Sequence, residues 1–474
     1  MMKRRSFLER ILLFSGGLVL SGGFTSAALA ASKTTITGTV RAGRKKLAGV
    51  IVSDGYSVVQ TNRKGRYELP VHAKANFVFV SVPAGYAFPN ENGIARHYQE
   101  LRKETPQKHY NFELAALPTD DTKHNFIIWA DPQTQNEQDV VRMLTEAVPD
   151  VQQLLKGMDS TVPVHGITVG DIVWDRFELY EDYNKGVAAM GIPFFQALGN
   201  HDQDLNKGGD EVSDDTFEAT YGPTYYSFNR GKVHYVVLDD VRYLGKDKQY
   251  DGYITEHQLE WLKKDLAFVP KEHLVILCLH IPVHTHVKNR HDLYPILKNH
   301  KVHIMSGHTH FNRNVIEEGI FEHNHGTVCG ALWTGPVCGD GTPNGYGVYE
   351  VDGTDLKWYY KSMGYEADHQ MHVYVQPQGN QKRVLANIWN WDPAWKVELY
   401  VDGNYKGALQ NVITHDPLAA ALYQGKDRPE GRTFVNPKET EHFFEAFVPN
   451  NTREVRFVAT DRFGRKYEGT KVVA

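Results

Sequence analysis

Residues 193–202 read Pro-Phe-Phe-Gln-Ala-Leu-Gly-Asn-His-Asp, and this stretch contains the most informative pattern in the chain. Its apolar part ends at Leu198, and a glycine and three polar side chains follow at once. A short apolar run bounded by turn residues is typical of a buried strand. We therefore predict a strand over residues 193–198 whose end presents the side chains of Asn200, His201 and Asp202.

Four further clusters of polar residues follow apolar runs in the same way. Because open α/β sheets bind ligands outside the carboxyl ends of their strands, we expect all five clusters to meet at one sheet edge. Their carboxylate, amide and imidazole groups are ligands for divalent metals. The pattern therefore indicates a hydrolase with two metal ions. The four clusters are Asp131-Pro132-Gln133, Gly170-Asp171, His280-Ile281-Pro282 and Gly307-His308-Thr309-His310.

Strands and helices alternate around these clusters. Phe126–Ala130 and Leu274–Leu279 have the composition of buried strands, whereas residues 139–155 and 256–268 have apolar residues at helical spacing. Such alternation predicts an α/β fold with a layered core.

Both ends of the chain have a different texture. From Thr35 to about Leu117, short β-branched and aromatic runs are separated by turn residues, which indicates a small β-sandwich. The spacing of Gly38, Val50, Asp54, Gly65 and Tyr67 resembles the transthyretin-like or carboxypeptidase-regulatory-like fold. A β-only region beyond Gly364 predicts a second, C-terminal β-sandwich. We expect three domains in the mature chain, and the middle one carries the clusters. The three predicted domains span residues 33–118, 122–365 and 366–474.

Residues 1–30 have the features of a cleavable export signal. A basic stretch precedes an apolar run from Ile11 to Leu20, and Ala28-Leu29-Ala30 matches a cleavage site. The paired arginines before Ser6 resemble a twin-arginine signal. The apolar run is too short for a stable membrane span, so we expect an exported protein, which is periplasmic, at the cell surface or secreted. An uncleaved membrane anchor is the alternative.

Composition excludes some other classes of protein. The formal net charge is -5, and residues 1–30 contribute net positive charge, so the mature chain is more acidic still. The chain has no excess of basic residues, so its charge does not indicate a nucleic-acid partner. The three cysteines lack the paired spacing of a disulfide framework. We expect Cys278 in the core and leave a bridge between Cys329 and Cys338 open.

The order of the clusters resembles that of the calcineurin-like metallophosphoesterases, whose motifs run D-x-H or D-x-Q, G-D, G-N-H-[DE], H and G-H-x-H. The resemblance extends from Phe126 to about Tyr360. It implies a layered β-sandwich core flanked by helices, with accessory β-domains similar to those of a bacterial exported subgroup. It also implies ligands for two divalent metal ions. These are Asp131, Asp171 and His310 for the first ion, and Asp171, Asn200, His280 and His308 for the second.

In this resemblance Asp171 would bridge the two ions, and His201 would face the substrate as an acid. Two positions depart from the commonest pattern. Gln133 stands where many members have a histidine, so its amide oxygen would be a harder ligand or the ligand would be lost. A hard ligand favours manganese, iron or magnesium over zinc, and manganese, iron and zinc all stay candidates. Asp175 is displaced by one position from the usual second carboxylate, so either Asp175 or Asp202 would orient His201.

The resemblance implies hydrolysis of a phosphoester substrate, either a monoester or a diester, by attack of a metal-bridging hydroxide. The alternative is a cell-surface binding protein, in which the two β-sandwiches bind a polymer and the central domain is catalytically idle. The complete set of expected ligands favours the enzyme.

Overall fold

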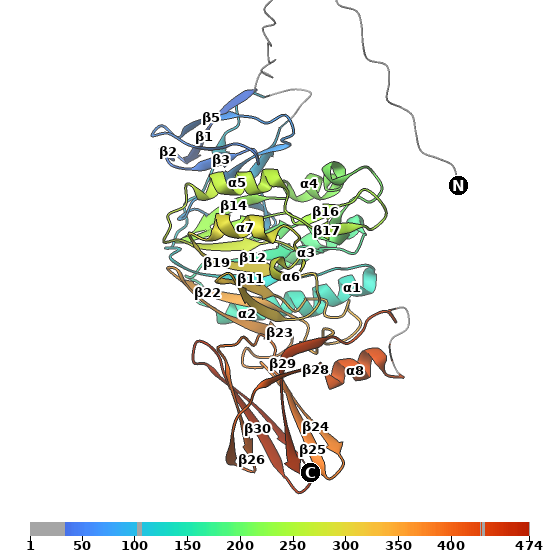
Figure 1. Ribbon diagram of the computed structural model, residues 1–474. Coiled ribbons are helices and arrows are strands. Elements are labelled where there is room, and N and C mark those ends of the chain that lie inside the picture. Colours follow the sequence, from blue (N-terminus) through green and yellow to red (C-terminus); the bar gives the residue numbers. More distant parts are fainter. Residues whose placement is uncertain (1–33, 102–106, 427, 429–431, 474) are drawn as a thin grey trace, which may run out of the picture. The chain divides into compact units, whose positions relative to one another are not determined.

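The computed structural model describes residues 34–473, except for residues 102–106, 427 and 429–431 (Figure 1). The predicted export signal over residues 1–30 lies outside the described residues. The described residues belong to one compact unit. None of the helices in the described residues is both long enough and apolar enough to cross a membrane.

Two mixed sheets form the middle of this unit. The first has seven strands and the second has six. The first runs in the order β23 (Asp355–Ser362), β22 (Gly345–Asp352), β11 (Lys123–Trp129), β12 (Val164–Val169), β13 (Phe194–Ala197), β8 (Ile94–Ala95) and β7 (Asn90–Glu91). The second runs in the order β14 (Tyr226–Arg230), β15 (Val233–Val237), β18 (Leu274–Cys278), β19 (Lys301–Ser306), β21 (Ile320–Asn324) and β20 (Arg313–Glu317).

The side chains of β11 show how the layers are built. Alternate residues of a strand point to opposite faces, and both faces of β11 are apolar. Phe126 and Ile128 pack in the core shared with the six-stranded sheet. Ile127 and Trp129 instead pack on the helices that cover the other face of the seven-stranded sheet. The two sheets therefore pack face to face, with helices on their outer faces.

Each sheet has its own helices. Residues of α2 and α3 share a core with the seven-stranded sheet, and residues of α5 and α7 share one with the six-stranded sheet. A π-helical turn over Met143–Ala147 joins α1 to α2. The hairpin of β16 (Val241–Tyr243) and β17 (Tyr250–Gly252) lies beside these layers. The helices are α1 (Glu137–Arg142), α2 (Val148–Gly157), α3 (Tyr180–Met190), α4 (Asp215–Tyr221), α5 (Glu256–Leu266), α6 (Val283–His286), α7 (Arg290–Leu297) and α8 (Pro417–Gln424).

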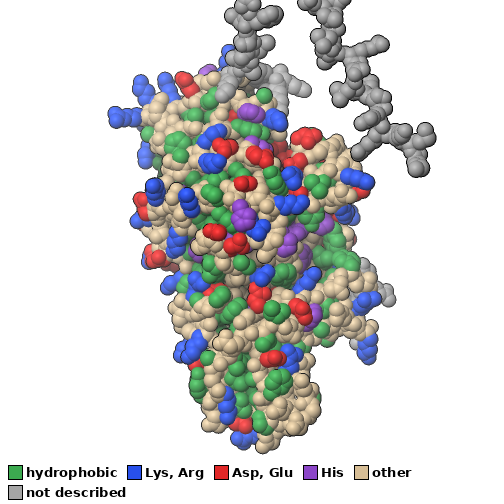
Figure 2. Space-filling model, in the orientation of Figure 1, with side chains coloured by type: hydrophobic (Ala, Val, Ile, Leu, Met, Phe, Trp, Pro, Cys, Tyr) green, Lys and Arg blue, Asp and Glu red, His purple; other side chains and the backbone are tan. Residues whose placement is uncertain are grey.

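The N-terminal sandwich consists of two four-stranded sheets. Lysine and arginine side chains gather over β1, β2 and β5 in the space-filling view (Figure 2). One sheet contains β10 (Phe112–Glu113), β1 (Thr35–Ala42), β2 (Lys45–Lys46) and β5 (Arg66–Pro70), and the other contains β4 (Val58–Gln60), β3 (Ile51–Ser53), β6 (Phe77–Ser81) and β9 (Tyr98–Glu100).

The C-terminal sandwich also has two four-stranded sheets, with a core that includes Val384, Leu399, Phe444 and Phe457. One sheet contains β24 (His372–Gln378), β25 (Gln381–Asn387), β29 (Glu439–Pro449) and β28 (Asn411–His415), and the other contains β27 (Asn404–Ala408), β26 (Lys396–Val401), β30 (Glu454–Thr460) and β31 (Lys466–Val472).

The predicted fold class is confirmed: a layered α/β core lies between an N-terminal and a C-terminal β-sandwich. The transthyretin-like topology and the three domain boundaries stay predictions. The seven-stranded sheet extends across the boundary that we expect after residue 118. Its strand β8 comes from the N-terminal part of the chain and pairs with β13. The three cysteines are buried and free, with Cys278 in the core as predicted.

Gly38 marks the tightest contact in the N-terminal sandwich. It lies in the middle of β1 opposite Tyr67 of β5, whose hydroxyl donates to the Tyr110 carbonyl oxygen at 2.7 Å. A Cβ atom at Gly38 would stand 1.7 Å from that same carbonyl oxygen. The close passage of β1 over Tyr110 therefore requires glycine.

We expect Gly38→Ala to lower the free energy of unfolding by about 1–3 kcal/mol or more, because backbone must move to relieve the clash. Urea unfolding of the purified chain would measure this. Gly157→Ala is the matched control: Gly157 ends α2, and its added Cβ would meet no atom of the described residues within 4 Å. Equal stability of the two variants would contradict the prediction.

Candidate metal centre

The predicted site residues leave the two sheets at the ends of parallel strands. Asp131 follows β11, Asp171 follows β12 and Asn200 follows β13, and these three strands are parallel neighbours. In the other sheet, His280 follows β18 and His308 follows β19, which are also parallel neighbours. Each sheet therefore delivers its polar groups to one edge.

The backbone turns sharply at most of these residues. Asp131, Asp171, His308 and His310 have φ angles of 47°, 48°, 70° and 54°, in the left-handed region that costs about 1–2 kcal/mol for a residue with a side chain. The φ angle of Gln133 is also positive, at 40°. The surrounding structure holds these conformations, which direct the side chains into a common crevice.

The glycines of the motifs make room for the predicted ligands. A Cβ atom at Gly170 would stand 2.5 Å from the His280 ring. At Gly199 it would stand 2.3 Å from Asp171 Oδ1, and at Gly307 it would stand 2.5 Å from Asp131 Oδ2. Any side chain at these positions would push a predicted ligand aside.

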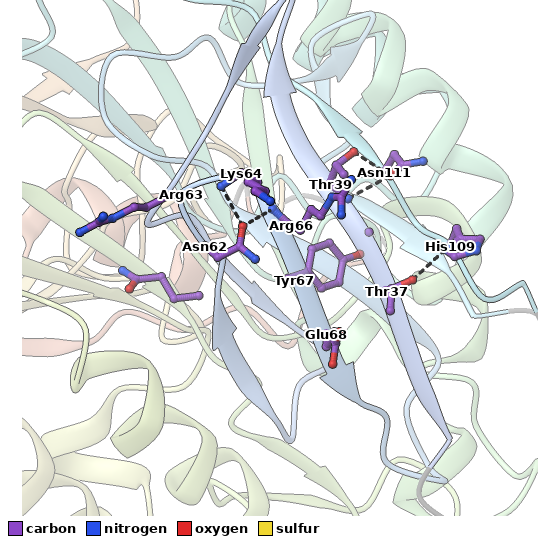
Figure 3. A pocket seen from close by; sticks show the side chains of 12 residues that line it. Thr37, Thr39, Asn62, Arg63, Lys64, Arg66, Tyr67, Glu68, His109 and Asn111 are labelled. Atoms are coloured by element: carbon purple, nitrogen blue, oxygen red, sulfur yellow. Dashed lines mark hydrogen bonds between the residues drawn. The ribbon is translucent and has the colours of Figure 1, made fainter.

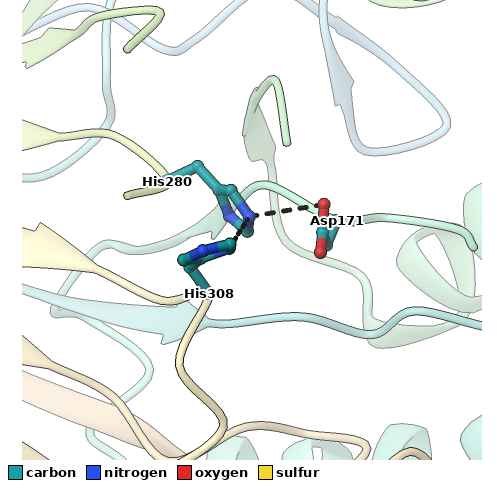
Figure 4. A group of neighbouring side chains, drawn as sticks. All are labelled: Asp171, His280 and His308. Carbon is teal, nitrogen blue, oxygen red and sulfur yellow. Dashed lines mark hydrogen bonds and ion pairs between the residues drawn. The ribbon is translucent and has the colours of Figure 1, made fainter. Parts of the chain in front are cut away.

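His280 is the centre of the first group of donors (Figure 4). Its Nδ1 donates to the Val169 carbonyl oxygen at 2.9 Å, so Nε2 carries the lone pair of the neutral ring. That Nε2 lies 3.1 Å from Asn200 Oδ1, 3.3 Å from Asp171 Oδ1 and 3.2 Å from His308 Nδ1. The ligand atoms of Asp171, His280 and His308 all lie within 4.8 Å of one another. Several electron-pair donors thus surround one point.

Asp131 and His310 form the second group. His310 Nδ1 lies 2.8 Å from the Gly330 carbonyl oxygen, which can only accept, so the His310 lone pair is on Nε2. This Nε2 lies 3.5 Å from Asp131 Oδ1. Asp131 is fully buried, and both of its carboxylate oxygens accept from the His308 N–H. The Nε2 atom thus faces a carboxylate oxygen, and it can bind a proton or a metal cation there.

Gln133 lies between the two groups. Its Nε2 donates to Asp171 Oδ2 at 3.0 Å, and its backbone N–H donates to the Asp171 carbonyl oxygen at 2.9 Å. Its buried Oε1 has no hydrogen-bond partner in the described residues. A buried acceptor without a donor is costly, so this oxygen is available to a cation.

His201 faces the same crevice. Its backbone N–H donates to Asp171 Oδ1 at 2.9 Å, and its Nδ1 lies 2.8 Å from Asp175 Oδ1. The other oxygen of Asp175 accepts from Lys248. Burial by itself would lower the pKa of His201, but Asp171 and Asp175 outweigh it and raise that pKa above its usual value.

Asp202 has a different environment. It is fully buried and accepts from the backbone N–H groups of Ile172 at 3.1 Å, Val173 at 3.3 Å and Gly199 at 3.0 Å. The Tyr180 hydroxyl donates to it at 3.1 Å. Asp202 therefore ties the turn after β12 to the turn after β13, whereas Asp175 is the carboxylate that contacts the His201 ring.

The charges of the site favour cations. Burial by itself would lower the pKa of His280, yet Asp171 and Asp131 raise it to about 10. Burial also raises the pKa of Asp171, but the His280 and His201 rings outweigh burial and hold that pKa below its usual range. The carboxylates thus create a negative potential that stabilises positive charge in the crevice.

A cavity of about 350 Å³ opens over these donors. Its wall includes residues that the sequence pattern did not single out, namely Trp174, Tyr250, Leu332, Phe434 and Lys438. Trp174 lies inside the motif that contains Asp171, so its position was a usable signal. Phe434 and Lys438 come from the C-terminal region, far along the chain from every motif, and no local pattern marks them.

A roomier hollow of about 940 Å³ lies on the N-terminal sandwich (Figure 3). It is lined by exposed polar side chains of an open sheet face, such as Arg63, Lys64 and Glu68. Several of its polar groups bond to each other, as Thr37 does to His109 at 2.7 Å and Thr39 to Asn111 at 2.8 Å. The buried donors beneath the smaller cavity make that cavity the better candidate.

Several solved structures are similar to the chain at low identity. Purple acid phosphatase PPD1 from yellow lupin (Lupinus luteus) seeds is 12% identical, over 66% of this chain and 67% of its own, with a TM-score of 0.39. GAP50, the anchor in the inner membrane complex of Plasmodium, is 15% identical over 51% of this chain and 84% of its own, with a TM-score of 0.34. A putative 5'-nucleotidase from Staphylococcus aureus is 12% identical over 51% of this chain and 53% of its own, with a TM-score of 0.33. These similarities are too distant to carry a functional argument. The curated proteins contain no significant match to the chain.

Three family models match successive parts of the chain. The model of calcineurin-like phosphoesterase matches residues 125–312, which include all seven predicted ligands. The model of the N terminal of calcineurin-like phosphoesterase matches residues 34–117, and that of the C terminal matches residues 322–467. Together they account for most of the described chain in the expected order. The chain therefore belongs to the calcineurin-like phosphoesterase family.

Proposed function

We propose that the chain hydrolyses phosphoesters with the help of two divalent metal ions held by the two groups of donors. The observation that carries this proposal is the pair of imidazole nitrogens, His280 Nε2 and His310 Nε2, that face carboxylate oxygens inside the protein. With both rings neutral such an arrangement is repulsive, and a proton on the ring or a metal cation between the donors removes the repulsion. The membership in the phosphoesterase family supports the same conclusion.

The residues fit two metal ions. Asp131 and His310 would hold the first, and Asn200, His280 and His308 would hold the second, with Asp171 shared between them. Gln133 Oε1, a buried acceptor with no partner in the described residues, is a further candidate ligand for the first ion. Oxygen ligands at the first ion favour manganese or iron, with zinc as the other candidate. Bound divalent cations supply Lewis acidity, which polarises the phosphoryl oxygens and makes water a stronger nucleophile near neutral pH.

The protein side chains would control the proton on the leaving group. His201 lines the cavity, and Asp175 holds its Nδ1 at 2.8 Å, so Nε2 is free to face a substrate. The raised pKa of His201 keeps the ring protonated closer to neutral pH, where it can donate to the departing oxygen. We assign His201 the role of general acid and Asp175 the role of its orienting partner. Asp202 would act on the backbone of both metal-binding turns.

A binding protein with an idle central domain is the competing function. No specific contact supports it, whereas most of the expected ligands line one cavity, which supports the enzyme. These are Gln133, Asp171, Asn200, His308 and His310. We also propose that the chain is exported, from the signal-like features of residues 1–30.

The direct test is hydrolysis of p-nitrophenyl phosphate and bis-p-nitrophenyl phosphate by metal-loaded protein. We expect turnover of at least one ester, loss of turnover with a chelator, and recovery on adding manganese or iron. His201→Ala should reduce kcat by about a hundredfold for an alkyl ester with a poor leaving group. It should keep the metal content of the parent. A metal-loaded protein that cleaves neither ester would favour the idle domain.

Gly199→Ala should weaken metal binding by about tenfold or more, because its Cβ would displace Asp171. Metal competition with a fluorescent chelator would measure the affinity. Gly157→Ala, on the outer helix α2, serves as the control and should bind metal as the parent does. Unchanged affinity in Gly199→Ala would remove Asp171 from the ligand set.

Asp175→Asn should move the basic limb of the pH profile of kcat to lower pH. Asp175 raises the pKa of His201, so its removal lowers that pKa, and the protonated acid is lost earlier as the pH rises. Asp352→Asn is the control, because Asp352 also pairs with a lysine, Lys123 at 3.0 Å, but on the exposed end of β22. A basic limb that stays in place in Asp175→Asn would contradict the roles assigned to this pair.

A further inference from the structure

A row of aromatic rings leads away from His201 along the cavity wall. The Trp174 ring lies edge-on to the His201 ring, with centroids 5.6 Å apart. The Phe434 ring lies edge-on to Trp174, with centroids 5.8 Å apart and an angle of 81° between the planes. Trp174 comes from the loop after β12, whereas Phe434 comes from the segment between α8 and β29. The C-terminal region therefore contributes a ring that packs against Trp174, the neighbour of the proposed acid.

The segment that carries Phe434 is firmly attached to the catalytic core. Arg432 forms an ion pair with Asp139 of α1 at 2.6 Å, and its guanidinium lies 5.9 Å from the centre of the Trp174 ring. Val435 is buried in a small apolar cluster that contains Ala331 and Tyr423. These attachments on both sides hold Phe434 over the cavity, so its position does not depend on its own burial.

Phe434 is a large apolar residue of this segment that is exposed. Its side chain is 55% exposed, although it is large and apolar, and it lines the cavity together with Trp174 and Leu332. Tyr250 lines the same cavity and lies edge-on to the His308 ring at 5.8 Å. An exposed apolar group that is held in place over a polar crevice marks a contact with a ligand that has an apolar part.

We propose that Trp174 and Phe434 form a subsite for a planar unsaturated ring in the leaving group of the substrate, such as an aryl group or a nucleobase. This inference rests on the proposed function, because it places the leaving group beside His201. An aliphatic group would also bury apolar surface there, but only a flat ring stacks on aromatic faces, which adds binding energy beyond the buried area. Trp174 and Phe434 are thus specificity residues, and the C-terminal module helps to select the substrate.

Equilibrium binding to the metal-loaded full chain tests this without turnover. Benzylphosphonate and cyclohexylmethylphosphonate carry the same charge and similar size, and differ in having a flat or a puckered ring. We expect calorimetry to show about fivefold tighter binding of the benzyl compound. Phe434→Ala should remove this preference, and Phe434→Tyr should keep it. Phe447→Ala is the matched control and should keep the preference, because Phe447 is also exposed, at 48%, but lies on β29 outside the cavity lining.

Equal affinity of the parent chain for the two phosphonates would overturn the proposal, and so would a preference that survives in Phe434→Ala. The matching phosphate esters then separate this proposal from the proposed function. A ring preference that depends on Phe434, in a protein that cleaves neither ester, would support the subsite while it contradicts hydrolysis. Cleavage of both esters with equal kcat/KM and no ring preference would support hydrolysis and overturn the subsite.

Discussion

The central physical constraint in this protein is that the electron-pair donors buried together need positive charge between them. His280 Nε2 faces Asn200 and Asp171 oxygens, and His310 Nε2 faces an Asp131 oxygen. Both rings are fixed in this orientation, because their Nδ1 atoms lie against backbone carbonyl oxygens. With neutral rings these groups repel one another, and either a proton, which the raised pKa of His280 favours, or a metal cation removes that repulsion. The fold therefore stores in its apo form an arrangement that is complementary to positive charge.

Much of the surrounding structure keeps these donors in place. Two sheets pack face to face and bring the ends of five strands to one region. The turns that follow use left-handed backbone at Asp131, Asp171 and His308, and glycine wherever a side chain would strike a ligand. Asp202 accepts hydrogen bonds from two of these turns and links them. Rigid strands with short, strained ends thus position the polar groups more accurately than a long loop could.

Two carboxylates next to the proposed ligands have different contacts. Asp175 pairs with the ring of His201 and with Lys248, whereas Asp202 is enclosed by backbone N–H groups. The C-terminal sandwich adds the other component of the site. Its anchored segment brings Phe434 to Trp174, so the cavity has donors at its floor and aromatic rings on its wall. The floor with the proposed metal ligands comes from the central sheets, and this part of the wall comes from the C-terminal region.

The sequence by itself determined the layered α/β core, the two β-rich ends and the donors of the floor. These follow from local patterns: apolar runs of strand length, helical spacing, and polar clusters at the ends of strands, as at Leu198 and Asn200. The tertiary structure alone decided that Asp175 contacts His201, that Gln133 bonds to Asp171, and that Phe434 reaches the cavity. Some of these contacts join residues that are far apart in the chain. Others distinguish between residues that the sequence pattern leaves equivalent. Their geometry depends on turn conformation and on how the modules pack, and no local pattern of residues encodes it.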